Sequence, residues 1–283
     1  MRHDSVQCLG PRGLHRMAYT EWGDPHNGRV LICVHGLTRN GRDFDFLAEA
    51  LAPRYRVVCP DVAGRGRSDW LRAASDYQMS TYLGDMVNLI ARLGVQSVHW
   101  LGTSMGGLIG MALAAQENTP VTRLVLNDVG PLITATAIKR IGECLGSTPA
   151  FASIEQAEAY TRALGATFGA LSDAQWRHLT VHTVRSAAGG GYEMIYDPAI
   201  AVPYREMMGD DDVDLWPMYE AVRCPTLLMR GAQSDLLRRD TALQMAQRGP
   251  QARLVEVPDV GHAPMLMDEF QIRTVSDFLL AEE

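Results

Sequence analysis

The sequence predicts an α/β fold, in which a mostly parallel sheet is covered by helices on both faces. Strand and helix patterns alternate along most of the 283 residues, and strands separated by helices of this length form parallel crossover units. A glycine-flanked serine lies in a short turn between one such strand and the next helix. Residues 131–216 interrupt the alternation with helical patterns and almost no strand signal, which indicates a helical insertion between two strands of one sheet.

The length and composition are those of a folded globular protein. At about 150 residues per domain, the chain makes one large domain or two small ones. Hydrophobic residues make up 47% of the chain and charged residues 21%, which argues against disorder. With 26 Lys and Arg against 33 Asp and Glu, the net charge is −7. This acidic balance argues against nucleic acid or an anionic membrane as a partner.

Three features predict a cytoplasmic protein. No stretch reaches the ~18–20 apolar residues that span a bilayer. Residues 1–16 are polar and interrupted by glycine and proline, without the apolar segment of a signal peptide. The five cysteines are widely spaced and contain no C-x-x-C pair, so we expect buried thiols rather than disulfides or metal ligands. These features leave the oligomeric state open.

The first half of the chain carries short runs rich in β-branched and apolar residues, which predict strands over 14–22, 29–34, 56–59 and 97–101. A helix is expected over 80–93, because its apolar residues recur at helical spacing and Gly94 is a natural C-terminal stop. The helix that follows the glycine-flanked serine is expected over 108–116.

One more strand is expected before the insertion, over 123–126. After the insertion, we expect strands over 226–229 and 254–257 and an amphipathic helix over 271–280. Inside the insertion, Ser153 with Gln156 and Ser172 with Gln175 have the spacing of capping boxes, which predicts two helix N-termini. Residues 189–191 are three glycines and are expected to form a mobile loop.

The glycine-flanked serine is Ser104, in the G-T-S-M-G run of residues 102–106. This is the G-x-S-x-G pattern in its required strand–turn–helix setting. The turn is tight, so small residues are needed two positions before and after the serine. The serine then projects from the carboxyl edge of the sheet at a helix N-terminus, which favours negative charge. Ser104 is therefore the candidate nucleophile.

A serine nucleophile needs a base and an acid that orients the base. The expected chain order is serine, acid, histidine. His262, in V-G-H-A-P after the last strand, is the candidate base. Two aspartates follow strands and compete for the role of acid, and we favour Asp235, whose polar loop leads into a helix, over Asp128. Asp128 has the alternative explanation of a turn residue before Gly130.

Two backbone N–H groups are expected to receive the negative charge that develops on oxygen in the tetrahedral intermediate. One belongs to Met105, which follows the nucleophile, and the other to Leu37, in the H-G-L-T turn after the strand over 29–34. We expect His35 of the same turn to stabilise the loop by hydrogen bonding.

Other motifs do not add a cofactor or metal site. Residues 61–68 read D-V-A-G-R-G-R-S, which lacks the lysine and spacing of a P-loop, and we interpret them as a structural turn. The sequence has no H-E-x-x-H motif and no Cys/His cluster. We therefore predict no metal.

Taken together, the motifs HGLT, DVAGRGRSD, GTSMGG, GAQSD and VGHAP resemble the α/β-hydrolase superfamily in order and spacing over nearly the whole chain. The resemblance implies an eight-stranded, mostly parallel sheet flanked by helices, with a helical cap inserted after the sixth strand. It places the core domain at 1–130 and 217–283 and the cap at 131–216. It also implies the triad and oxyanion roles given above, and no cofactor.

Differences between this sequence and other members of the superfamily narrow the choice of branch. A serine nucleophile departs from the haloalkane dehalogenases and epoxide hydrolases, which use aspartate. The loop HGLTRNGRDFD resembles that of bacterial carboxylesterase and lactonase relatives. We therefore predict a serine hydrolase that cleaves a carboxylic ester or lactone of a small to medium acyl substrate through an acyl-enzyme. The alternatives are a C–C bond hydrolase of meta-cleavage-type diketones and a non-enzymatic ligand receptor.

Five further residues are candidates for contact with the small-molecule substrate. Arg39 and Asn40 follow the H-G-L-T turn and would meet a polar or acidic acyl group, and a solvated loop is the alternative. Trp216 and Met265 would line an apolar pocket, and core packing is the alternative. The fifth candidate for contact with the substrate is His35.

Overall fold

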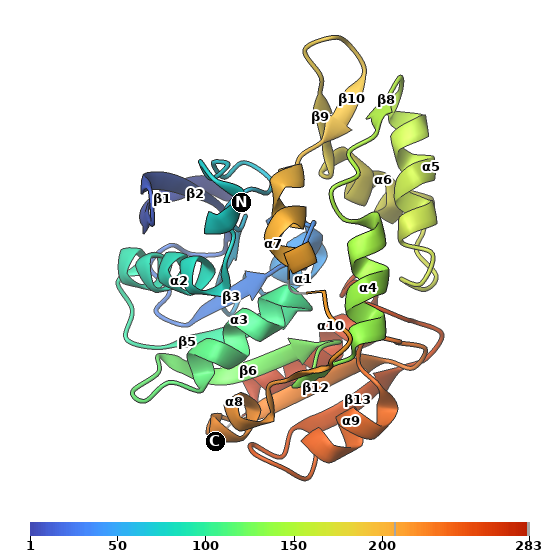
Figure 1. The fold of residues 1–283 in the computed structure, drawn as a ribbon. Coiled ribbons are helices and arrows are strands. Elements are labelled where there is room, and N and C mark those ends of the chain that lie inside the picture. The colour runs from blue at the N-terminus through green and yellow to red at the C-terminus, as the bar shows by residue number, and fades with distance from the viewer. Residues whose placement is uncertain (207, 282–283) are drawn as a thin grey trace.

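The computed structural model describes residues 1–206 and 208–281, and it does not describe the side chain of residue 144. Its centre is an eight-stranded sheet (Figure 1). The strands lie in the order β1 (Arg2–Gly10), β2 (Gly13–Trp22), β4 (Arg56–Pro60), β3 (Val30–Val34), β5 (Val98–Thr103), β6 (Val121–Asn127), β12 (Thr226–Gly231) and β13 (Arg253–Val257). The pairs β1–β2 and β2–β4 are antiparallel, and the other pairs are parallel. The predicted fold class is confirmed.

Strand β1 lies in the segment that the sequence analysis treated only as a polar N-terminus. It pairs with β2 from Arg2 opposite Glu21 to Gly10 opposite Gly13. Only Val6 and Cys8 of its side chains are buried. The strand was not predicted because so few apolar positions show the two-residue period.

Helices cover both faces of the sheet because side chains alternate along each strand. Ile32 and Val34 pack on one face, and Leu31 and Cys33 on the other. The first face is covered by α2 (Met79–Leu93), α3 (Met105–Ala114), α8 (Trp216–Ala221) and α9 (Arg239–Met245). The second is covered by α1 (Asp45–Leu51) and α10 (Glu269–Leu280). The sheet is therefore buried on both sides, as parallel sheets are.

The chain between β6 and β12 forms elements outside the main sheet. They are β7 (Leu132–Ile133), α4 (Ala135–Cys144), β8 (Ala150–Phe151), α5 (Ile154–Leu164), α6 (Asp173–Val181), β9 (Val184–Ser186), β10 (Tyr192–Met194), α7 (Ala201–Glu206) and β11 (Val213–Asp214). Strands β7 and β11 pair with each other where this segment leaves and rejoins the core. Figure 1 shows α4, α5 and α6 beyond the ends toward which the β3 and β6 arrows point.

Both predicted helix starts in this segment are observed. Ser153 and Ser172 cap α5 and α6 by accepting the N–H of Gln156 and Gln175. The full reciprocal capping box forms only at Ser172, because the Gln156 side chain accepts from the Ala152 N–H instead. The short strands β8, β9 and β10 were not predicted, since two or three residues are too few for a periodic signal.

Two further features bear on the predicted location. The cysteines whose side chains are described, Cys8, Cys33, Cys59 and Cys224, are all free thiols. Across the described part of the chain, every helix is too short or too polar to cross a bilayer.

Candidate active site

Ser104 lies in a strained turn between β5 and α3. Its backbone has φ 53° and ψ −118°, a conformation that is rare for a residue other than glycine. The flanking glycines make this possible. A side-chain carbon on Gly102 would lie 2.1 Å from the Gly106 carbonyl oxygen, and one on Gly106 would lie 2.0 Å from the Val34 carbonyl oxygen. The pattern thus aims the serine side chain away from the sheet at the start of a helix.

His262 lies between Ser104 and a buried carboxylate. Its Nε2 is 3.0 Å from Ser104 Oγ, and its Nδ1 is 2.8 Å from Asp128 Oδ2. The loop between α5 and α6 holds the histidine backbone, because Thr167 Oγ1 donates to the His262 carbonyl at 3.0 Å and the Gly261 N–H donates to the Thr167 carbonyl at 2.7 Å. The three side chains form a continuous chain of hydrogen bonds from carboxylate to hydroxyl.

Asp128 directly follows β6 and is completely buried, at 0% exposure. Besides His262, it accepts hydrogen bonds from the Gly231 N–H at 2.9 Å and from Ser234 Oγ at 2.6 Å. A buried carboxylate needs such donors, since an unpaired charge in the interior is costly. Because an ionised carboxylate can only accept, its contact with His262 favours the imidazole form that carries the proton on Nδ1, which leaves Nε2 free to accept from Ser104.

The prediction that Asp235 orients His262 is wrong. Its side chain is 58% exposed and forms an ion pair with Arg140 of α4, with Arg140 Nε 2.7 Å from Asp235 Oδ2. The preceding residue, Ser234, is the one that turns inward and donates to Asp128. The alternative acid named from the sequence, Asp128, occupies the position beside the imidazole.

The turn after β3 lies against Ser104. A side-chain carbon on Gly36 would lie 3.7 Å from Ser104 Cβ. His35 is fully buried and supports the turn, because its Nδ1–H donates to the Gly36 carbonyl at 2.7 Å and its Nε2 accepts from the Val62 N–H at 2.9 Å. Burial lowers the pKa of His35 to about 3. The residue is therefore a neutral loop support, as expected, and not a substrate contact.

The amides predicted to bind the oxyanion flank Ser104. Met105 is the first residue of α3, so its N–H has no partner within the helix. Leu37 lies in the turn that Gly36 brings against the serine. The arrangement has a nucleophile, a base and a buried acid joined by hydrogen bonds, with the helix-terminal N–H of Met105 next to the nucleophile in the chain, which is a set suited to acyl transfer.

Comparisons with known proteins agree with this chemistry. A profile for the alpha/beta hydrolase fold matches residues 29–142. The chain is similar to a 3-hydroxybutyrate-oligomer hydrolase from Cupriavidus necator, at 52% identity over 280 residues that cover 96% of both chains. The chain belongs to the α/β-hydrolase family. The predicted activity, a hydrolase acting on carboxylic esters, agrees with this relationship.

More distant members of the family are also similar over most of their length. An N-formylmaleamate deformylase from Pseudomonas putida is 29% identical over 255 residues, 87% of this chain and 86% of its own. The crystal structure of an alpha/beta hydrolase from Novosphingobium aromaticivorans superposes with a TM-score of 0.87 at 33% identity and covers 98% of each chain.

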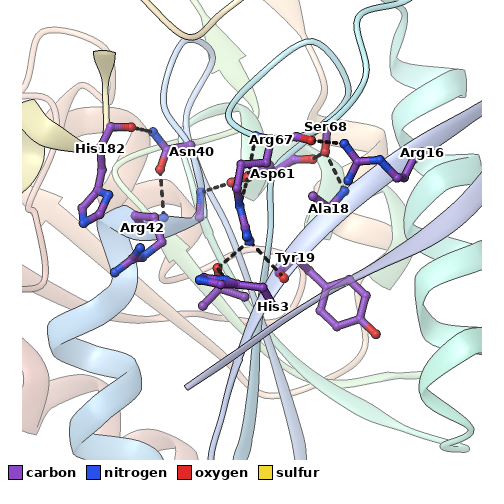
Figure 2. Close-up of polar contacts among 12 residues, drawn as sticks. His3, Arg16, Ala18, Tyr19, Asn40, Arg42, Asp61, Arg67, Ser68 and His182 are labelled. Atoms are coloured by element: carbon purple, nitrogen blue, oxygen red, sulfur yellow. Dashed lines mark hydrogen bonds and ion pairs between the residues drawn. The ribbon is translucent and has the colours of Figure 1, made fainter. Parts of the chain in front are cut away.

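Arg39 and Asn40 of this α/β hydrolase do not have the substrate-facing position considered above. Asn40 is 2% exposed, and its Nδ2 donates to the His182 carbonyl at 2.7 Å (Figure 2). Arg39 pairs with Asp43 and donates to Thr183 Oγ1 at 3.1 Å. Both side chains therefore tie the segment after the Leu37 turn to the residues that follow α6. Sequence reasoning missed this role because the partners lie more than 140 residues away.

Trp216 and Met265 are packing residues, the alternative considered above. Trp216 stacks under the Arg248 guanidinium, 3.7 Å from its ring centroid. Met265 belongs to a buried apolar cluster with Trp176, Leu179 and Met267. Neither contact supports a role in binding substrate.

The motif over residues 61–68 is a structural turn, as predicted. Asp61 accepts the N–H groups of Gly41 and Arg67, each at 2.9 Å (Figure 2). Burial raises the pKa of the Asp61 carboxyl, and these two hydrogen bonds lower it in part. A side-chain carbon on Gly66 would lie 2.4 Å from the Asp61 carboxylate. The glycine is needed so that the turn can close on this acid.

Two groups of potential metal-ligating side chains occur among the described residues, and both lie outside the Ser104 site. One joins Cys8, His15 and Asp85, and the other joins Asp45, His178 and His182. In the second group, Asp45 is already paired with Arg42. In the first, burial raises the pKa of the Cys8 thiol to about 12, which disfavours the thiolate form that binds metals.

Proposed function

We propose that Ser104, His262 and Asp128 are the catalytic triad of a serine hydrolase that cleaves carboxylic esters of 3-hydroxy acids. The observation that carries the proposal is the pair of contacts at His262, 3.0 Å to Ser104 Oγ and 2.8 Å to Asp128 Oδ2. This geometry allows the imidazole to take a proton from the serine while the carboxylate stabilises the resulting cation.

The reaction proceeds in two halves. Ser104 Oγ attacks the ester carbonyl carbon as its proton passes to His262 Nε2, and the carbonyl oxygen becomes an oxyanion held by the Leu37 and Met105 N–H groups. When the intermediate collapses, the ester C–O bond breaks and His262 gives its proton to the leaving alcohol. Water, deprotonated by His262, then attacks the acyl-enzyme carbonyl. When the acyl C–O bond to Ser104 breaks, His262 returns the proton to Ser104 Oγ and the acid is released.

The proposed substrate is a short oligomer of a hydroxy acid such as 3-hydroxybutyrate. Its support is the 52% identity, over 96% of both chains, to the 3-hydroxybutyrate-oligomer hydrolase of Cupriavidus necator. Such an oligomer is a small-molecule polyester, so each cleavage is the ester hydrolysis described above. We propose residues 131–216 as the cap that limits access, since the Thr167 loop contacts the His262 backbone.

The test compares the wild type with Ser104→Ala on 3-hydroxybutyrate dimer and trimer and on p-nitrophenyl esters from acetate to palmitate. We expect release of 3-hydroxybutyrate by the wild type and at least a 10⁴-fold loss in Ser104→Ala. Hydrolysis of aryl esters without cleavage of the oligomers would reject the substrate and keep the mechanism. Turnover of a meta-cleavage dienoate without ester hydrolysis would favour the C–C hydrolase. No turnover and no labelling by a fluorophosphonate would favour the receptor.

We also propose that the protein works in the cytoplasm. The free thiols of Cys33 and Cys59, which lie buried on neighbouring strands, support a reducing compartment. Fractionation of the native host, followed by detection of the protein in the soluble cytoplasmic fraction or outside it, tests this proposal.

A further inference from the structure

Arg65 is a buried cation beside the proposed oxyanion site. It is 0% exposed and is among the largest fully buried side chains of the protein. It comes from the turn over residues 61–68, in which the Asp61 carboxylate is occupied by the N–H groups of Gly41 and Arg67. Buried arginines are normally paired with a carboxylate, so the partners of this guanidinium need an explanation.

Its hydrogen bonds go to uncharged groups. Nε donates to the Leu37 carbonyl at 2.8 Å, and Nη2 lies 3.6 Å from Met105 Sδ. Nη1 donates to the Ala63 carbonyl at 2.7 Å and to Tyr82 Oη at 2.9 Å. One side chain therefore contacts both residues whose N–H groups are proposed to bind the oxyanion.

The contact with Leu37 bears directly on the geometry of that site. The carbonyl and the N–H of Leu37 belong to successive peptide planes, so holding the carbonyl limits rotation about the bonds between them. The contact with Met105 places the side chain of the first residue of α3 against the same guanidinium. Oxyanion binding depends on donors being held in place before charge develops, and Arg65 supplies a shared anchor for both.

Charge adds to this effect. The positive charge of Arg65 meets carbonyl and hydroxyl dipoles and the rings of Tyr77 and Tyr82, whose centroids are 5.8 and 5.1 Å from the guanidinium carbon. A positive charge in a low-dielectric interior favours negative charge forming nearby. The oxyanion forms next to the two residues that Arg65 contacts.

We propose that Arg65 is a positioning residue for the transition state, which holds the Leu37 and Met105 amides in place and stabilises the oxyanion electrostatically. The proposal rests on the proposed function, because it assumes that these two amides bind the oxyanion. A lysine cannot replace it fully, since an ammonium lacks the planar fork that reaches Leu37, Met105 and Tyr82 from three nitrogens.

The experiment measures kcat and KM for p-nitrophenyl butyrate in the wild type, Arg65→Met and Arg65→Lys. The matched control is Arg123→Met, which removes another buried arginine that donates to backbone carbonyls, those of Phe278 and Ala281, on the α10 side of the sheet. We expect kcat to fall about 10²–10³-fold in Arg65→Met, the cost of losing one oxyanion donor. KM stays close to the wild-type value, and the control keeps its kcat.

A second readout separates transition-state positioning from general damage. Inhibition by an alkylboronic acid, which forms a tetrahedral adduct on the serine, weakens in Arg65→Met by the same factor as kcat/KM, whereas binding of the product acid is unchanged. Circular dichroism checks folding of each variant. If Arg65→Met does not fold, Arg65→Lys decides, with an expected loss in kcat of at least tenfold.

Three results would overturn the inference. A kcat within threefold of the wild type in a folded Arg65→Met or Arg65→Lys would show that the anchor is not needed. Equal losses in kcat in Arg65→Met and Arg123→Met would show a general effect of losing a buried arginine. A wild type without Ser104-dependent ester hydrolysis would refute the proposed function itself, and the Arg65 role with it.

Discussion

Replacing Asp128 by asparagine tests the assignment of the acid. The Gly231 N–H donates to Asp128 Oδ1, so in the variant the amide oxygen is expected to stay at that position. The amide nitrogen then faces His262 Nδ1. Because this nitrogen donates, it favours an imidazole whose Nδ1 is unprotonated and whose Nε2 carries the proton.

The size of the effect follows from that tautomer. An Nε2–H cannot accept the Ser104 proton across the 3.0 Å contact, and the imidazolium loses its carboxylate partner. Loss of the acid in a triad of this kind lowers kcat by about 10⁴-fold, or about 5 kcal/mol of transition-state stabilisation. The fold should survive, since the amide keeps the Gly231 contact and the volume of the buried side chain.

The assay is steady-state hydrolysis of p-nitrophenyl butyrate, with Asp235→Asn as the matched control. The Asp235→Asn variant loses only an exposed ion pair with Arg140. Such pairs contribute little to stability, so the kcat of this variant should stay within about twofold of the wild type. If Asp235→Asn lost most of its kcat while Asp128→Asn kept more than a tenth of the wild-type kcat, the assignment of Asp128 as the acid would be refuted.

Three other perturbations follow from the same contacts. Burial lowers the pKa of His35 to about 3 from its ordinary 6.5, so the unfolded chain binds the proton first and the free energy of unfolding decreases as pH falls below about 6.5. Urea titrations at pH 7 and 5 should show this decrease, with a smaller decrease in His35→Gln; equal decreases would contradict it. Gly106→Ala places a carbon 2.0 Å from the Val34 carbonyl oxygen and should cost at least about 1–3 kcal/mol of stability along with most activity; wild-type behaviour in both assays would argue against the strained turn. Asn40→Ala leaves the His182 carbonyl without its donor and should lower the free energy of unfolding by about 1–3 kcal/mol; an unchanged urea midpoint would show that this tie is dispensable.

The residues best predicted from sequence are those whose position depends on local geometry. Ser104 needs Gly102 and Gly106 at two-residue spacing because of backbone contacts within one turn. His262 follows the last strand, so its place at the carboxyl edge of a parallel sheet follows from the strand order alone. The eight-stranded sheet itself follows from alternating strand and helix patterns, except for β1, whose apolar positions are too few.

Local geometry and strand order could not predict which aspartate is the acid. Asp128 and Asp235 follow β6 and β12, which are neighbours in the sheet, so both reach the same edge. What separates them is direction: Asp128 has φ 54° and turns inward, and Ser234 occupies the corresponding inward position in the other loop. The roles of Arg39, Asn40 and Thr167 could not be predicted from the sequence either, because each depends on a partner distant in the sequence.

The most direct test of the central claim is to trap the acyl-enzyme. The wild type and Ser104→Ala are mixed with 3-hydroxybutyrate trimer, quenched in acid within a turnover and digested for peptide mass spectrometry. The account predicts a hydroxybutyryl ester on the peptide that contains Ser104, absent from the variant, together with release of the shortened oligomer. Oligomer cleavage by Ser104→Ala at the wild-type rate, or an adduct on another residue, would contradict it.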